Sequence, residues 1–98
     1  MTISELQELL RKIDVEKGWR TNTIESGVAK ALMPTLVTKI LLCHSELSEA
    51  VEEIRNNRFE SYVGDNGKPE GWAVELADCI IRLFNILDEF GYDVESLI

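Results

Sequence analysis

The chain has 98 residues, 45% of them hydrophobic, and a formal net charge of -8 from 18 acidic and 10 basic residues. This length suits a single domain over residues 1–98, and the small number of prolines and glycines excludes a disordered chain. The acidity argues against a nucleic-acid partner, because the phosphate backbone would be repelled unless a cation intervened. No apolar run is long enough to cross a membrane.

The two cysteines predict a reducing environment. Cys43 and Cys79 lie in apolar stretches without a CxxC motif, and the N-terminus has neither the basic start nor the apolar core of a signal peptide. We therefore expect buried, reduced thiols in a cytoplasmic protein.

The first helix is predicted over residues 4–17, with Ser4 as N-cap and Gln7 reaching back in a capping box. Gly18 is placed to end it. A loop is expected over 18–23, followed by a short helix over 24–33. Pro34 favours the start of a new helix, because proline is accommodated in a first helical turn.

Two long helices are predicted next, over 34–57 and 70–90, joined by a connection over 58–69. Pro69 is expected at the start of the later one and Gly91 near its end. Spacings of three and four residues predict a core stripe along the earlier helix, made of Leu36, Ile40, Cys43, Leu47, Ala50 and Ile54. The later helix is apolar around much of its circumference, so we expect it to be central.

A short final turn over 94–98, capped by Asp93, leaves Leu97 and Ile98 in need of cover. A chain of this size buries only about 60 to 65% of its unfolded surface. The expected fold is therefore an all-α helical bundle, built on two long antiparallel helices and completed by homo-oligomerisation, as a homodimer or homotetramer.

Two pairs of acids stand out within the long helices. Glu46 and Glu49 are three residues apart, and Glu75 and Asp78 repeat that spacing, so each pair projects from one face of its helix. Glu49 lies roughly 12 Å before the end of its helix and Glu75 roughly 7 to 8 Å after the start of the next. In an antiparallel hairpin the two pairs can therefore face each other.

The sequence neighbours of these acids favour a metal site over a salt-bridged surface. Glu46, Glu49 and Glu75 lack a basic residue four positions later, and only Asp78 has one, in Arg82. Unpaired carboxylates beside apolar stripes raise each other's pKa values unless a cation binds. An oxygen-only ligand set selects Mg²⁺, or Mn²⁺, over zinc. Solvated acidic helix surfaces remain the alternative interpretation.

The pattern ExxE on one helix and ExxD on the next resembles the MazG-like all-α nucleoside triphosphate pyrophosphohydrolases. The resemblance covers about residues 34–91. It includes the stretches His44-Ser45-Glu46-Leu47-Ser48-Glu49-Ala50 and Val74-Glu75-Leu76-Ala77-Asp78.

This resemblance implies a Mg²⁺-dependent enzyme that cleaves a (deoxy)nucleoside triphosphate between its α and β phosphates, giving the monophosphate and pyrophosphate in nucleotide-pool house-cleaning. It implies metal ligands at Glu46, Glu49, Glu75 and Asp78. The candidates for the catalytic base are Glu49 and Glu53. The candidate substrate contacts are Lys39, Arg82, Asn85, Trp19 and Asn22.

The chain departs from the pattern in two places: Asn85 stands where an aspartate is usual, and the helix that commonly follows is absent after Ile98. Two other functions therefore stay open, a non-catalytic metal-binding helical assembly or regulatory module, and an activity like that of phosphoribosyl-ATP pyrophosphohydrolase. A di-iron carboxylate enzyme is disfavoured, because the single histidine is not three residues after a glutamate.

Overall fold

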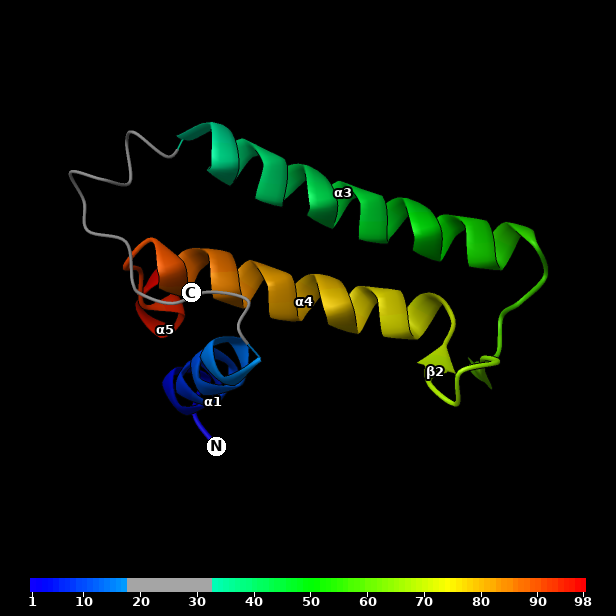
Figure 1. Cartoon of the computed structure of the whole chain (residues 1–98), viewed down its shortest axis with the longest axis horizontal. Helices are drawn as coiled ribbons and strands as arrows, with labels where there is room; N and C mark the ends of the chain where they lie inside the picture. The colour runs from blue at the N-terminus through cyan, green and yellow to red at the C-terminus, as the bar shows by residue number, and fades with distance from the viewer. Residues whose placement is uncertain (18–32) are drawn as a thin grey trace.

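The computed structural model describes residues 1–17 and 33–98 (Figure 1). Its helices are α1 (Ile3–Glu16), α3 (Met33–Arg55), α4 (Trp72–Glu89) and α5 (Val94–Leu97), and its strands are β1 (Tyr62–Val63) and β2 (Pro69–Glu70). The predicted all-α class is confirmed, since the only sheet in the described ranges is this pair of two-residue strands. The loop and the short helix expected between positions 18 and 32 lie outside the described residues. Of the helices that are described, none has the length and apolar content needed to span a bilayer.

Helix α4 lies at the centre of the fold, as its apolar sequence predicts. It packs against α3 and α1, and it also contacts α5 and β2. Figure 1 shows α3 and α4 side by side, with the chain reversing direction between them, and α1 on the other side of α4. The helix therefore contacts every other described element except β1, which pairs with β2.

The hydrophobic core is small and lies between α3 and α4. Cys43 and Cys79, both free thiols, form it together with Ile86. The predicted stripe on α3 is only partly correct: Cys43 and Ala50 are buried, and Leu36 packs against the core. The other three members, Ile40, Leu47 and Ile54, keep 43%, 45% and 48% of their surface exposed. Contact with α4 covers only one edge of the stripe, because a single helix cannot cover a wide apolar face.

The predicted capping box of α1 is wrong by two residues. Thr2 is the N-cap: its side chain accepts a hydrogen bond from the backbone of Glu5, whose carboxylate in turn accepts one from the backbone of Thr2. The predicted pair Ser4 and Gln7 and the observed pair Thr2 and Glu5 both have the spacing of the capping-box pattern. Ser4 and Gln7 instead lie inside the helix, where their side chains are used in contacts with the C-terminal turn.

The connection between the long helices is more ordered than the sequence indicates. Pro69 does not begin α4 but pairs with Val63 in the antiparallel β1–β2 ladder. Gly71 is the N-cap of α4 with φ 129, and a Cβ there would lie 3.3 Å from the Cα of Ser61. Glycine is favoured at this position both by the positive φ and by the close approach.

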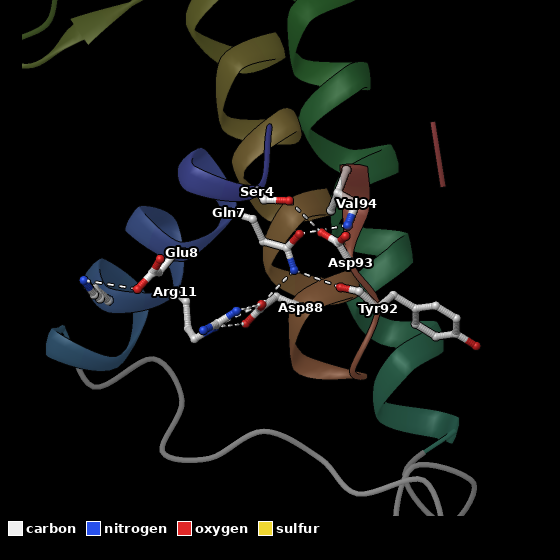
Figure 2. A network of polar contacts seen from close by, with 9 residues as sticks. Ser4, Gln7, Glu8, Arg11, Asp88, Tyr92, Asp93 and Val94 are labelled. Atoms are coloured by element: carbon white, nitrogen blue, oxygen red, sulfur yellow. Dashed lines mark hydrogen bonds and ion pairs between the residues drawn. The ribbon is translucent and has the colours of Figure 1, made fainter. Parts of the chain in front are cut away.

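A polar network joins α1 to the C-terminal turn (Figure 2). The buried Gln7 amide donates to the carboxylate of Asp88 and to the carbonyl of Tyr92, and it accepts from the backbone of Val94, each at 2.8 Å. Arg11 adds a bidentate contact to Asp88 at 2.7 to 3.0 Å. This network fixes α1 against the end of α4, and so determines where α1 lies relative to the acidic residues.

Candidate functional site

Three of the four predicted metal ligands converge between the long helices. Glu46 comes from α3, and Glu75 and Asp78 come from α4; each offers a carboxylate oxygen, and these oxygens lie within 4.8 Å of one another. The spacing of three residues on α4 puts its two acids on one face, and the chain reversal turns that face toward Glu46. We call this group the acidic cluster.

Glu49, the fourth predicted ligand, lies beside the acidic cluster and is not one of its three converging residues. Its side chain is exposed. A hydrogen bond and the negative charge of Glu49 both contribute to raising the pKa of Glu75. The structure therefore puts Glu49 next to Glu75, outside the group whose oxygens meet.

The carboxylates of the acidic cluster perturb one another. The pKa of Glu75 is raised to about 8, first by a hydrogen bond with Glu46, then by burial and by Glu49. The pKa of Asp78 is raised by burial and by the charge of Glu46. The pKa of Glu46 is lowered, first by the hydrogen bond with Glu75 and then by Arg82. The pair formed by Glu46 and Glu75 therefore retains a proton to a higher pH than an isolated glutamate would.

Arg82 contacts the acidic cluster in a way that the sequence does not indicate. The sequence pairs it with Asp78, four residues earlier on the same helix. Its guanidinium NH2 instead donates to Oε1 of Glu46 across the helix interface, at 2.9 Å. This cross-helix ion pair neutralises part of the negative charge.

A cleft of about 640 Å³ opens beside the acidic cluster, between α1, α3 and α4. Its volume lies in the range of small-molecule sites, which extends from about 300 to 1,000 Å³. The predicted substrate residues Lys39, Arg82 and Asn85 all line it, together with Glu46 and Asp78. The remaining lining residues are Leu10, Ile13, Asp14, Lys17, Leu42, Ile81, Ile86 and Glu89.

The polar groups of the cleft differ in how well they are paired. Lys39 forms an ion pair with Glu89. By contrast, Oδ1 of Asn85 and Nε of Arg82 are buried without a hydrogen-bond partner among the described residues. A buried polar atom without a partner is costly, so these two atoms are suited to bonding a ligand or water in the cleft.

Glu53, a predicted candidate for the catalytic base, has a different set of contacts. Its carboxylate accepts a hydrogen bond from the hydroxyl of Tyr62 at 2.8 Å and lies 3.8 Å from the guanidinium of Arg58. Both partners belong to the connection between α3 and α4. Glu53 therefore ties this connection to the end of α3.

The site has one wall that the sequence interpretation missed. Leu10, Ile13 and Asp14 of α1, with Lys17 at its C-cap, line the cleft, although the apolar residues of α1 read as ordinary core positions. Only the packing of α1 on α4 turns that face toward Glu46. The predicted contacts Trp19 and Asn22 lie outside the described residues.

The donor chemistry of the acidic cluster fits a hard divalent cation. Its three converging atoms are all carboxylate oxygens, which Mg²⁺ and Mn²⁺ prefer. Glu46, Glu75 and Asp78 would hold such an ion, with Glu49 close by. An ion at this position would face the cleft.

Fold and site together define a helical protein with an acidic cluster at the edge of a ligand-sized cleft. Comparisons of the chain with protein-family models, curated proteins and solved structures gave no match. Its function is therefore argued from the chemistry of these side chains.

Proposed function

We propose that the protein is a Mg²⁺-dependent nucleotide pyrophosphohydrolase of the MazG-like type. It would cleave a (deoxy)nucleoside triphosphate between the α and β phosphates to the monophosphate and pyrophosphate, as a house-cleaning activity in the cytoplasm. The observation that carries the proposal is the convergence of Glu46, Glu75 and Asp78 at the edge of a cleft that also contains Lys39 and Arg82. Carboxylates for a metal and cations for phosphates are the two requirements of phosphoryl transfer.

In this proposal the residues have separate tasks. The acidic cluster holds Mg²⁺, which when bound neutralises phosphate charge and lowers the pKa of the attacking water. Lys39 and Arg82 orient the phosphates from the cleft. The amide of Asn85 hydrogen-bonds the nucleoside, and the apolar side chains around it exclude water.

Glu49 is the better candidate for the base that takes the proton from water. It is exposed beside Glu75 and is not one of the three residues whose oxygens converge. Oε1 of Glu53 accepts a hydrogen bond from Tyr62 and Oε2 lies near Arg58 without a hydrogen-bond partner among the described residues, which favours a role in holding the connection. A base must reach the water directly or through one other water molecule, and Glu49 is nearer to the acidic cluster.

The test is pyrophosphate release from a panel of ribo- and deoxyribonucleoside triphosphates, and from phosphoribosyl-ATP, with Mg²⁺ or Mn²⁺. We expect release with at least one substrate. Glu46→Gln and Glu75→Gln should each lower the rate by at least about 100-fold, because a metal ion contributes several kcal/mol to such reactions. Glu52→Gln is the matched control, since Glu52 pairs with Arg55 on the exposed side of α3.

The outcomes separate the candidate functions. Mg²⁺ binding with no pyrophosphate release from any substrate would support the non-catalytic metal-binding module instead. Release that persists undiminished in Glu46→Gln and Glu75→Gln would contradict the assigned site.

We also propose that the chain works as a homodimer. Large apolar side chains are exposed along both long helices and form what we call the apolar face: Ile40, Leu47, Val51, Ile54, Leu76, Ile80 and Leu83. On α3, Glu46 lies about 60° to one side of the buried Cys43 and Leu47 about 40° to the other. On α4, Asp78 lies about 100° to one side of Cys79 and Leu76 about 60° to the other.

The apolar face therefore lies on the side of the helix pair opposite to the acidic cluster. A second copy fits it, because two chains of charge -8 can meet there without bringing their acidic clusters together. The two helix pairs would then form a bundle with a shared apolar core.

A further inference from the structure

The ion pair between Arg82 and Glu46 joins two groups with unequal exposure. The Glu46 side chain keeps 16% of its surface exposed and that of Arg82 keeps 40%. The guanidinium therefore reaches the acidic cluster from the wetter, cleft-facing side. Glu46 is also one of the three residues whose oxygens could hold a metal ion.

A divalent cation and the guanidinium compete for the same carboxylate. Two positive charges about 4 Å apart repel each other, so a metal ion bound at the acidic cluster would weaken the contact between Arg82 and Glu46. We infer that Arg82 is a stand-in cation, which neutralises Glu46 while the metal is absent and is released into the cleft when the metal binds. This inference rests on the metal site of the proposed function and adds an order of events to it.

The side chain of Arg82 can stay in the cleft after it leaves Glu46. Arg82 already lines it, beside Lys39 and Asn85, and its Nε has no hydrogen-bond partner within the described ranges. A guanidinium offers five donors in a planar fork that matches phosphate oxygens. Metal binding therefore frees Arg82 from its ion pair and creates an anion site. Bound metal should then increase the affinity of the protein for phosphate, and bound phosphate should increase its affinity for the metal.

Lys39 provides the matched control. It is a second cation in the same cleft, but its ion pair is with Glu89 instead of a member of the acidic cluster. Removing Lys39 deletes the same charge without freeing a metal ligand. The difference between the two variants isolates the contact between Arg82 and Glu46 from the general effect of charge.

The first experiment is a calorimetric titration of the nucleotide-free protein with Mg²⁺. We expect Arg82→Met to bind Mg²⁺ about fivefold or more tightly than wild type, within the usual range of coupling between sites, and Lys39→Met to change the affinity by less than about twofold. The titration is done at about pH 8.5, where protons compete less for the carboxylates of the acidic cluster. Unchanged or weaker Mg²⁺ binding by Arg82→Met, or equal tightening by Lys39→Met, would overturn the inference.

Two further measurements test the release itself. In NMR spectra of wild type, the Nε–H signal of Arg82, identified by its absence in Arg82→Met, should shift on addition of Mg²⁺; a signal unmoved at saturating Mg²⁺ contradicts release. With saturating Mg²⁺, inorganic phosphate should bind wild type at least about fivefold more tightly than Arg82→Met. Equal phosphate affinity would exclude Arg82 as the anion contact.

Circular dichroism establishes whether each variant is folded. If Arg82→Met does not fold, Arg82→Gln takes its place. The metal titration needs no turnover, so a protein that hydrolyses no nucleotide can still confirm or contradict the exchange. Failure to bind Mg²⁺ at all would reject both the proposed function and this inference. Metal binding without tightening in Arg82→Met would reject the inference alone.

Discussion

At the scale of single residues, the acidic cluster shows how neighbouring groups shift the pKa of a carboxylate. The sequence predicts raised pKa values for acids that lack a basic partner four residues later. This prediction is confirmed for Glu75, whose pKa is raised to about 8. It is wrong for Glu46, whose pKa is lowered. The reason is that Glu46 is hydrogen-bonded first by Glu75 and then by Arg82, both on the other helix, where a search along one helix cannot detect them.

The raised pKa of Glu75 predicts that the metal-free protein loses stability as pH rises. Its ordinary value is 4.5 and its folded value is about 8, so the folded state binds more protons between these limits and the free energy of unfolding falls. The lowered pKa of Glu46 gives an effect that is lost only below pH 4.5. From about pH 6 to 9 the trend therefore follows Glu75.

Thermal unfolding in EDTA measures this dependence. We expect the Tm of wild type to fall over that pH range, and Glu75→Gln to have a higher Tm at pH 8 and a flatter profile. Glu52→Gln should follow wild type. A Tm independent of pH, or the same slope in Glu75→Gln, would contradict the account of the acidic cluster.

At the scale of elements, the C-terminal turn is held by the side of α1. The amide of Gln7 makes three hydrogen bonds, to Asp88, to the carbonyl of Tyr92 and from the backbone of Val94. The sequence assigns Gln7 to the capping box of α1. That local pattern fits, but the Thr2 and Glu5 pair fits equally well, and only the docked C-terminal turn decides between them.

Removing the amide should therefore destabilise the whole fold. In Gln7→Leu, the backbone N–H of Val94 loses its buried acceptor and Asp88 loses a donor, which should cost about 2 to 3 kcal/mol of unfolding free energy. Ser4→Ala is the matched control in the same interface, because the contacts of Ser4 to Asp93 and Glu95 are exposed. It should cost less than about 0.5 kcal/mol.

Urea denaturation of the two variants provides the comparison. Equal midpoints for Gln7→Leu and wild type would show that the network contributes nothing. A loss in Ser4→Ala as large as that in Gln7→Leu would show that burial is not the cause.

At the scale of the whole molecule, one chain is less compact than its length would allow. Its radius of gyration is 15.2 Å and its extents are 46 × 31 × 28 Å, whereas a compact domain of this length has a radius of about 13 Å. The apolar face also has no cover in the described part of the chain. A homodimer would supply the missing layer.

A charge on the apolar face should prevent the dimer. Val51 and Ile80 are 52% and 53% exposed, and burying an aspartate at either position would lower the association constant by at least about 30-fold, or about 2 kcal/mol. Val63→Asp is the control, because Val63 is 71% exposed and belongs to β1, outside the two long helices that form this face. Sedimentation velocity measures the state of each protein.

We expect wild type and Val63→Asp to sediment as a dimer, and Val51→Asp and Ile80→Asp as monomers. The Tm of wild type should also rise with concentration, because association stabilises the folded state. A monomeric wild type would reject the dimer, and dimers in both aspartate variants would show that another surface is used.

The sequence by itself predicted the helical class, the central position of α4 and four candidate acids, of which Glu46, Glu75 and Asp78 meet between α3 and α4. These features depend on periodicity and on fixed rises along a helix, which are local properties of the chain. Only the tertiary structure decided that Arg82 pairs with Glu46, that α1 forms a wall of the cleft and that Gln7 holds the C-terminal turn. Each of these depends on which surfaces of distant segments come into contact, and many pairings satisfy the same local pattern.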